Sequence, residues 1–496
     1  MWQDRLRRSD FSGIGVAVWL ALAQLTGCVT TQPKGLTTRE LPVAFRQPSG
    51  SAISGATSAM ELDQWWTQYG SDELNDLVSR AMRGNAELLG AQQQVLQAKV
   101  RLDQVRAGTL PNLTAPIRAV EQSHGSRSDS QNNSQAFVTA TYRLDIWGEQ
   151  EGLYAAAKMQ AQRAEHDKLN VQRLTIGGVA DTYIAYLSAN ESLEVARATE
   201  VLSRRSLELS EQRLVLGDAT VEDVERQRTV LAQHTISVLT LENQIEDLRA
   251  NLSRLIGELP ESIAISANGL ENLRIPQATI GVPSQLLLNR PDILSMEDRL
   301  RAADANIGVA RARMLPPIDL TAQVGYSGTA LASLLQPQNL VANAAASLVL
   351  AIFDGGARKA DGALAQSVYE EMVIAYGKTI LQAIREVESA LMAMQTARRK
   401  LASQTVIAQS AHRILRSGME AYAAGALDLA TLLEYRKNHQ RTVDELKKAK
   451  AEMLRSHINL SVALGGGLKT HSESSSELAD AQPMKTGKAS EINARN

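Results

Sequence analysis

The sequence predicts a mainly α-helical protein with a smaller β part that crosses a membrane, organised as two structural repeats. First, one plan recurs along the chain: Leu110-Pro111 returns as Leu315-Pro316 and Ile256-Gly257 as Leu464-Gly465, at offsets of 205 and 208 residues. Second, four segments alternate apolar and polar residues, as membrane-spanning strands do. Third, residues 149–216 contain no proline, which favours one very long helix.

The alternating segments predict four strands. The pattern is clearest in 318–327, where Ile318, Leu320 and Val324 alternate with polar residues. The predicted strands are 113–119, 136–146, 318–327 and 346–352. The alternative is two hairpins with one face on a soluble core; the lack of any further segment to cover them favours the membrane. Four strands cannot close a barrel, so we expect the sheet edges to pair with other copies of the chain.

The helical segments are longer than a compact domain uses. We expect a first helix at about 72–107, and a second that begins after Gly148 and extends to Leu216, about 100 Å at 1.5 Å per residue. Its counterpart begins after Asp354-Gly355-Gly356. The returning helices carry heptads, which predict coiled-coil packing. One seam is Val224, Leu231, Val238, Ile245 and Leu252, and adding 208 gives Leu432, His439, Leu446, Met453 and Leu460.

The N-terminus has the pattern of an export signal. Arg5, Arg7 and Arg8 precede the apolar run 14–23, which is too short for a permanent membrane span. The following Leu25-Thr26-Gly27-Cys28 resembles the lipobox of bacterial lipoproteins, which implies a covalent lipid on Cys28, the only cysteine of the chain. The alternative is a chance cysteine beside a signal. We expect no other cofactor.

These features predict the domain organisation. We expect a signal peptide at 1–27, a lipidated tether at 28–60, a first repeat at 61–262, a connector at 263–285, a second repeat at 286–468 and a disordered polar tail at 469–496.

Charge and motifs exclude several classes of function. The net charge is −2 and no basic stripe occurs, which argues against nucleic acid as a partner. No phosphate-binding G-x-x-x-x-G-K-[ST] loop is present, and the seven histidines form no metal-binding motif, so we expect no enzyme activity and no metal site. Paired acids such as Glu386 and Glu388 are expected on a solvated helix face.

Several motifs together resemble the outer membrane factors, the TolC and OprM-like efflux ducts, and specifically their NodT-type lipoproteins. They are Trp65-Trp66 followed by Asp72, Leu74, Leu77 and Asn85; Arg290-Pro291-Asp292-Ile293; 302–313; Leu315-Pro316; Phe353-Asp354-Gly355-Gly356; and Leu464-Gly465-Gly466-Gly467. The resemblance implies a trimeric α/β-barrel channel, with twelve barrel strands and twelve helices in a periplasmic tube. It also implies a bacterial outer-membrane location, a periplasmic adaptor protein and an inner-membrane pump as partners, and passive export of substrates. The alternative function is a lipid-anchored periplasmic coiled-coil adaptor.

The resemblance also implies a gate at the periplasmic tip, where each hairpin reverses. In relatives, a ring of aspartates and a hydrophobic residue follow the second tip glycine. Here Leu427 and Asp428 lie two and three residues after Gly425, which is a shift of one position. The first tip offers three further candidates, namely Gly217, Asp218 and Asp223. For Asp428 and Asp218 the alternative role is to cap the starts of helices.

Overall fold

The computed structural model describes residues 64–122, 131–266, 269–276, 290–329 and 331–466. All of them belong to the unit Val43–Asn496. The expected signal peptide, the tether with Cys28, part of the 263–285 connector and the 469–496 tail lie outside the described residues.

The first repeat starts with a short 3-10 helix, η2 (Trp65–Tyr69), and two α-helices, α3 (Asp72–Gly84) and α4 (Ala86–Gly108). The prediction of one continuous helix over 72–107 was wrong, because the helix is interrupted at Asn85. Asn85 has an extended ψ of 122°, and its side chain accepts a hydrogen bond from the Leu88 amide, so it starts a new helix. Ser71 caps α3 in the same way.

The strands are β1 (Asn112–Thr114), β2 (Ile117–Gln122), β3 (Gln131–Leu144), β4 (Ile318–Gly328) and β5 (Leu340–Leu348). β1 and β2 both pair with β3, which pairs with β4, which pairs with β5, all antiparallel. The two repeats therefore form one sheet. The short 3-10 helices η5 (Leu331–Ser333) and η6 (Pro337–Asn339) connect β4 to β5.

The predicted bounds of the fourth strand, 346–352, were wrong. β5 ends at Leu348, which lies opposite Ile318 at the first position of β4. Residues 349–352 extend past β4 and have no strand partner there, whereas Leu340 lies opposite Tyr326 near the other end.

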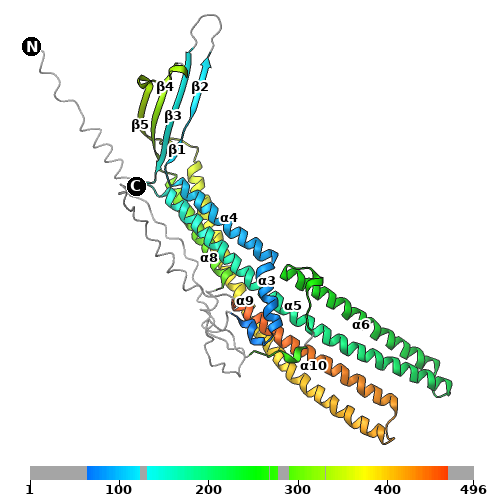
Figure 1. Ribbon diagram of the computed structural model, residues 1–496. Helices are drawn as coiled ribbons and strands as arrows, with labels where there is room; N and C mark the ends of the chain where they lie inside the picture. Colours follow the sequence, from blue (N-terminus) through cyan, green and yellow to red (C-terminus); the bar gives the residue numbers. More distant parts are fainter. Residues whose placement is uncertain (1–63, 123–130, 267–268, 277–289, 330, 467–496) are drawn as a thin grey trace, which may run out of the picture. The chain divides into compact units, whose positions relative to one another are not determined.

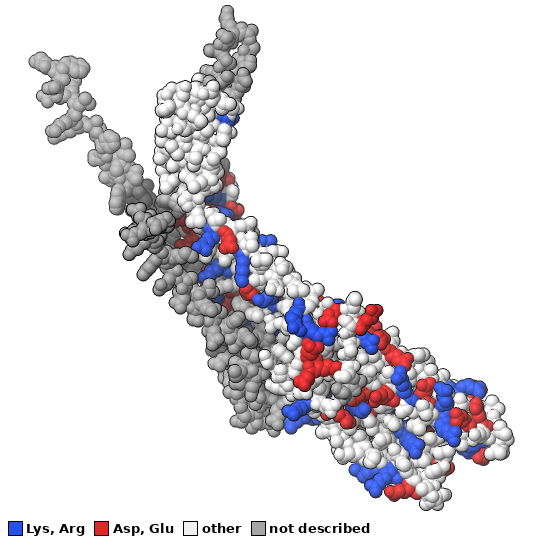
Figure 2. All heavy atoms as spheres, in the orientation of Figure 1, with Lys and Arg blue, Asp and Glu red and all other residues white. Residues whose placement is uncertain are grey.

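Cross-strand register gives the sheet one apolar and one mainly polar face, because residues directly opposite each other share a face. Val138, Val324 and Ala342 lie in one row, and Tyr142, Leu320 and Ala346 in another. The row of Ala140, Ala322 and Ala344 lies between them on the same face, whereas a row of the other face consists of Thr139, Gln323 and Asn343. Figure 2 shows almost no charged side chains on the visible surface of this sheet, whereas the helices display both signs of charge.

Two long hairpins follow the strand pairs (Figure 1). α5 (Glu149–Val215) and α9 (Ala357–Ala423) each contain 67 residues, and the returning helices are α6 (Val221–Ile256) and α10 (Leu429–Ala463). Gly148 and Gly356, at φ of 74° and 89°, precede the long helices, as the sequence predicts. α10 also packs against α5, and α8 (Pro291–Ala312) packs against both α5 and α9.

The heptad seam is confirmed as the packing face of the returning helices. Val224, Val238, Ile245 and Leu252 are buried in α6, as are Leu432, Met453 and Leu460 in α10. The α6 seam residues Val238, Ile245 and Leu252 belong to a hydrophobic core in which η2 and α3 pack against α5, α6 and α10. Its centre is Tyr69, which is fully buried, donates to the Leu454 carbonyl at 3.1 Å and lies 3.2 Å from Nδ1 of His457.

Among the helices of the described residues, none combines the length and the apolar character that a bilayer span requires.

Candidate functional site

The first hairpin reverses at residues 216–220. α5 ends at Val215, and Gly217 adopts a φ of 78°, a left-handed conformation that favours glycine. Asp218 does not cap a helix; its carboxylate pairs with Arg213 at 3.1 Å. Asp223 instead completes a capping box, accepting from the Thr220 amide at 3.1 Å, and this hydrogen bond lowers the pKa of Asp223.

The second hairpin reverses in the same way around Gly425, at a φ of 74°. Asp428 caps α10, accepting hydrogen bonds from the Thr431 hydroxyl at 2.6 Å and amide at 3.0 Å. These bonds hold the pKa of the exposed Asp428 below its ordinary value, so the carboxylate stays charged at neutral pH. The capping role is therefore present, and it leaves a charge at the tip.

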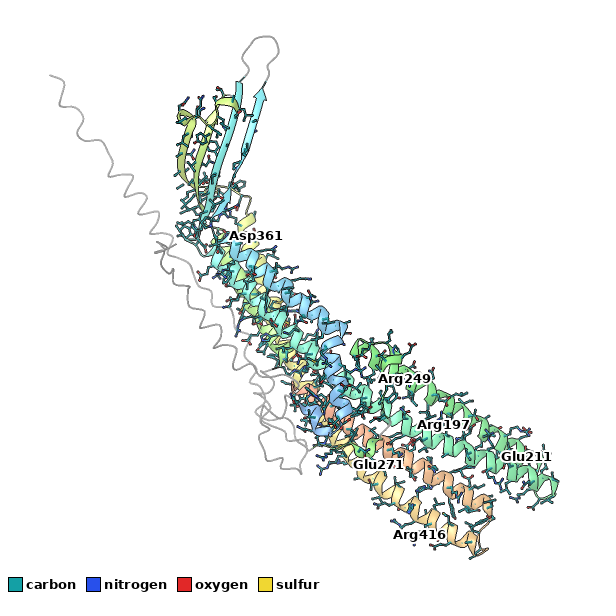
Figure 3. The ribbon with its side chains drawn as sticks, viewed as in Figure 1. Arg197, Glu211, Arg249, Glu271, Asp361 and Arg416 are labelled. Carbon is teal, nitrogen blue, oxygen red and sulfur yellow. The ribbon has the colours of Figure 1, made fainter. Side chains whose placement is uncertain are left out.

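Leu427 folds back onto its own hairpin. A Cβ added at Gly418 of α9 would lie 3.6 Å from Leu427 Cδ2, an ordinary packing distance, and 2.5 Å from Tyr435 Cδ2, so glycine at position 418 lets Tyr435 approach α9. Asp428 differs from the aspartates of the first tip. Asp218 pairs with Arg213 and Asp223 lies 3.6 Å from Arg226, but Asp428 has no ion pair among the described residues. Figure 3 labels Glu211 and Arg416 on the arms of the two hairpins near these tips.

A buried arginine network holds the other end of α10. Arg290 is 1% exposed; its guanidinium donates to the Ala463 carbonyl at 2.8 Å and to Asp292 and Glu386 at 2.6 and 2.8 Å. Burial alone would lower the pKa of Arg290, but the two carboxylates outweigh it and raise this pKa. Glu386 lies on a partly solvated face, with its side chain 37% exposed, and it is also a partner of this arginine.

Arg173 of α5 joins the same end of α10 from the first repeat. It is 4% exposed and donates to the Val462 carbonyl at 2.6 Å and to Asn170. Burial, and then the nearby charge of Arg290, lower the pKa of Arg173. No local pattern predicts this role of Arg173, since the Val462 carbonyl lies 289 residues further along the chain. Arg173 therefore joins the first repeat to the carbonyls that end α10, beside the contact that Arg290 makes within the second repeat.

Charged side chains also link the sheet to the helices. Arg143 of β3 lies opposite Asp319 of β4 and donates to it at 2.8 Å. Glu149, at the start of α5, lies 3.9 Å from Arg143 and accepts from Arg313 at 2.9 Å. Trp147 donates to the Pro316 carbonyl at 2.8 Å. These contacts fix the helices relative to the strands from which they continue.

The described residues contain no group of three or more metal-ligating side chains. A groove of about 480 Å³ lies between α5, α6 and α10, and its lining includes His234, Lys437 and Arg441. These sites therefore have two roles. The arginine contacts hold the ends of the long helices together, and the hairpin reversals present charged side chains at exposed tips.

Comparison with known proteins identifies the architecture. A model of the family described as "outer membrane efflux protein" matches residues 77–258 and 282–466. The chain belongs to the outer membrane efflux protein family. This membership makes it a transport channel of the bacterial outer membrane and not an enzyme, and it overturns the alternative of a periplasmic adaptor.

Relatives of this efflux protein align over most of their length. The pyoverdine export outer membrane protein OpmQ of Pseudomonas aeruginosa is 29% identical over 459 residues, covering 90% of this chain and 96% of the relative. The cation efflux system protein CusC of Escherichia coli is 25% identical over 458 residues, covering 90% of this chain and 98% of the relative. The probable outer membrane lipoprotein SilC of Salmonella typhimurium is 26% identical over 452 residues, covering 89% and 96%.

Solved channels share the fold. The CmeC outer membrane channel of Campylobacter jejuni superposes with a TM-score of 0.78 at 22% identity, covering 87% of this chain and 93% of that one. The open-state MtrE outer membrane channel of Neisseria gonorrhoeae superposes with a TM-score of 0.76 at 24% identity, covering 87% of this chain and 96% of that one. The efflux protein therefore has the mainly α fold with a transmembrane β part that the sequence predicts.

Proposed function

We propose that three copies of this efflux protein close one barrel in the outer membrane and form a passive conduit. Substrates enter it from a periplasmic adaptor and an inner-membrane pump. The observation that carries the proposal is the five-stranded sheet with one apolar face and two free edges. β1 and β2 follow each other along β3 and together form one edge, and β5 forms the other, so the sheet is four strands wide. In hydrocarbon each unsatisfied backbone group costs several kcal/mol, so these edges need partner strands. Neighbouring copies of the chain supply them without any additional protein.

The relatives support a conduit that does not itself select the exported substrate. OpmQ is named for pyoverdine export and CusC for cation efflux, which are chemically unlike cargoes, yet each aligns with 90% of this chain. A scaffold shared between such cargoes is not the part that selects them. We assign selection and the supply of energy to the pump.

The hairpin tips are the proposed gate. Gly217 and Gly425 allow the reversals, Leu427 packs back on α9, and Asp428 presents a charge that no cation neutralises among the described residues. Asp218 and Asp223, both in ion pairs, are secondary candidates. In a trimer the three copies of Asp428 repel one another if they face the axis, so docking of an adaptor that neutralises or separates them opens the conduit. The covalent lipid proposed for Cys28 anchors the N-terminus in the same membrane.

Single-channel conductance of the purified, full-length protein in planar bilayers tests the gate. Asp428→Asn removes the charge but keeps a good N-cap, whereas Asp428→Ala removes both. If the charge constricts the tip, both variants raise conductance to a similar level. If only Asp428→Ala raises it, the cap and not the charge is responsible, and the charge gate is wrong; wild-type traces from both variants remove Asp428 from the gate. The control is Asp361→Asn, an exposed residue of α9 close to the sheet (Figure 3).

A further inference from the structure

Two histidine rings face each other across the second hairpin. His412 of α9 and His439 of α10 have ring centroids 5.5 Å apart and an interplanar angle of 49°. They are 27 residues apart in the sequence and lie 13 residues before and 14 residues after Gly425. At 1.5 Å per residue the pair is about 20 Å from the reversal.

Both rings are available to a ligand. His412 is exposed and His439 half-buried, and neither ring takes part in a hydrogen bond or an ion pair within the part of the chain that the structure describes; only the backbone carbonyl of His439 accepts one, from the Thr442 hydroxyl. Other histidines are occupied: His166 contacts Asp298 at 2.7 Å, and His457 contacts Tyr69 at 3.2 Å.

The spacing of the rings matches two imidazoles on one metal ion. A zinc to nitrogen distance of about 2.0 to 2.1 Å places the ion about 3.2 Å from each ring centroid. A tetrahedral angle at the ion then separates the centroids by about 5.2 Å, and a linear arrangement by about 6.4 Å. The observed 5.5 Å lies between these two values.

We propose that His412 and His439 form a two-histidine site for a divalent transition metal ion of the Zn²⁺, Ni²⁺ or Cu²⁺ class, with water completing the coordination. Imidazole nitrogen is a preferred ligand of these ions. The bound ion links α9 to α10 and stiffens the arm that carries Gly425 and Asp428. The site belongs to the second hairpin alone, because the positions 208 residues earlier are Arg204, which pairs with Glu200, and Leu231.

Calorimetric titration of Zn²⁺ into the full-length protein, purified in detergent without a polyhistidine tag, tests the site. We expect one ion per chain in the wild type and loss of this binding in both His412→Ala and His439→Ala. The matched control is His234→Ala, which removes a half-buried histidine of α6 outside the pair and leaves the stoichiometry at one. Absence of binding by the wild type overturns the proposal, and so does an unchanged stoichiometry in the two single variants.

A variant that gains a metal site tests the proposal in a way that misfolding cannot imitate. Arg204→His combined with Leu231→His places two histidines at the equivalent positions of the first hairpin. We expect this variant to bind two ions per chain, since the two hairpins share their heptad register. If this variant still binds one ion per chain, the placement of two histidines across a hairpin is not what creates the metal site. Neither titration depends on conduction, so failure of the metal site leaves the proposed function intact.

Discussion

Arg290 and Asn85 occupy equivalent positions in the two repeats, 205 residues apart, and each binds the end of its returning helix. Arg290 donates to the Ala463 carbonyl and Asn85 to the Leu255 carbonyl, both at 2.8 Å. The two acceptors are 208 residues apart. The duplication has thus preserved a contact while its chemistry diverged from a neutral amide to a guanidinium with two acidic partners.

The first prediction concerns this anchorage. Arg290→Ala leaves Asp292 and Glu386 without their cation and the Ala463 carbonyl without a donor, so we expect a loss of about 3 to 5 kcal/mol in unfolding free energy. Thermal or guanidinium unfolding followed by circular dichroism measures it. Arg299→Ala, at an exposed position of α8, is the control and should stay near wild type. Equal stability of the two variants would show that the network is dispensable.

The second prediction concerns acid sensitivity at Tyr69 and His457. Burial lowers the pKa of His457 from 6.5 to about 4, so folding favours the neutral ring. This contribution is fully present above pH 6.5 and is lost as pH falls from 6.5 to about 4, and it amounts to about 3 kcal/mol. Unfolding midpoints measured across this pH window should fall less steeply in His457→Gln than in the wild type. The exposed His412→Ala should retain the wild-type slope, and an identical slope in His457→Gln would disprove the assignment.

The third prediction separates the two faces of the sheet. Val324 lies in an apolar row and its neighbour Gln323 in a polar row. Arginine at a lipid-facing midplane position costs about 2 to 4 kcal/mol, whereas an arginine facing the lumen stays hydrated. We therefore expect Val324→Arg to lower the yield of folded protein in the outer membrane and Gln323→Arg to leave it near wild type. The opposite ranking would mean that the faces are reversed.

The fourth prediction concerns Cys28. With the signal left intact, Cys28→Ser should abolish incorporation of labelled palmitate and shift part of the protein to the soluble periplasmic fraction, because each buried acyl CH₂ contributes about 0.8 kcal/mol. Labelling of the serine variant at the wild-type level would show that the lipid is attached elsewhere or that the label is nonspecific.

Local signals predicted much of this fold, and tertiary contacts determined the rest. Gly148, Gly217 and Gly425 mark a helix start and the two reversals, because their positive φ angles need glycine whatever surrounds them. The alternation in 318–327 predicted β4 for the same reason, since it depends only on which face each residue takes.

Elements whose limits depend on a distant partner were missed. β5 ends where β4 has no further residue to pair, and the break at Asn85 is fixed partly by its hydrogen bond to Leu255. The arginine network around Arg290, and the approach of His412 to His439, join residues far apart in the sequence. A pattern that operates over a few residues carries no signal for such pairs.

The central claim is that the β1/β2 edge of each sheet pairs with the β5 edge of a neighbouring copy. Native mass spectrometry of the full-length protein released from detergent counts the chains in one particle directly. Three chains per particle is the result expected for a barrel of twelve strands. A particle with a single chain would leave β1/β2 and β5 unpaired in the membrane and would contradict the account.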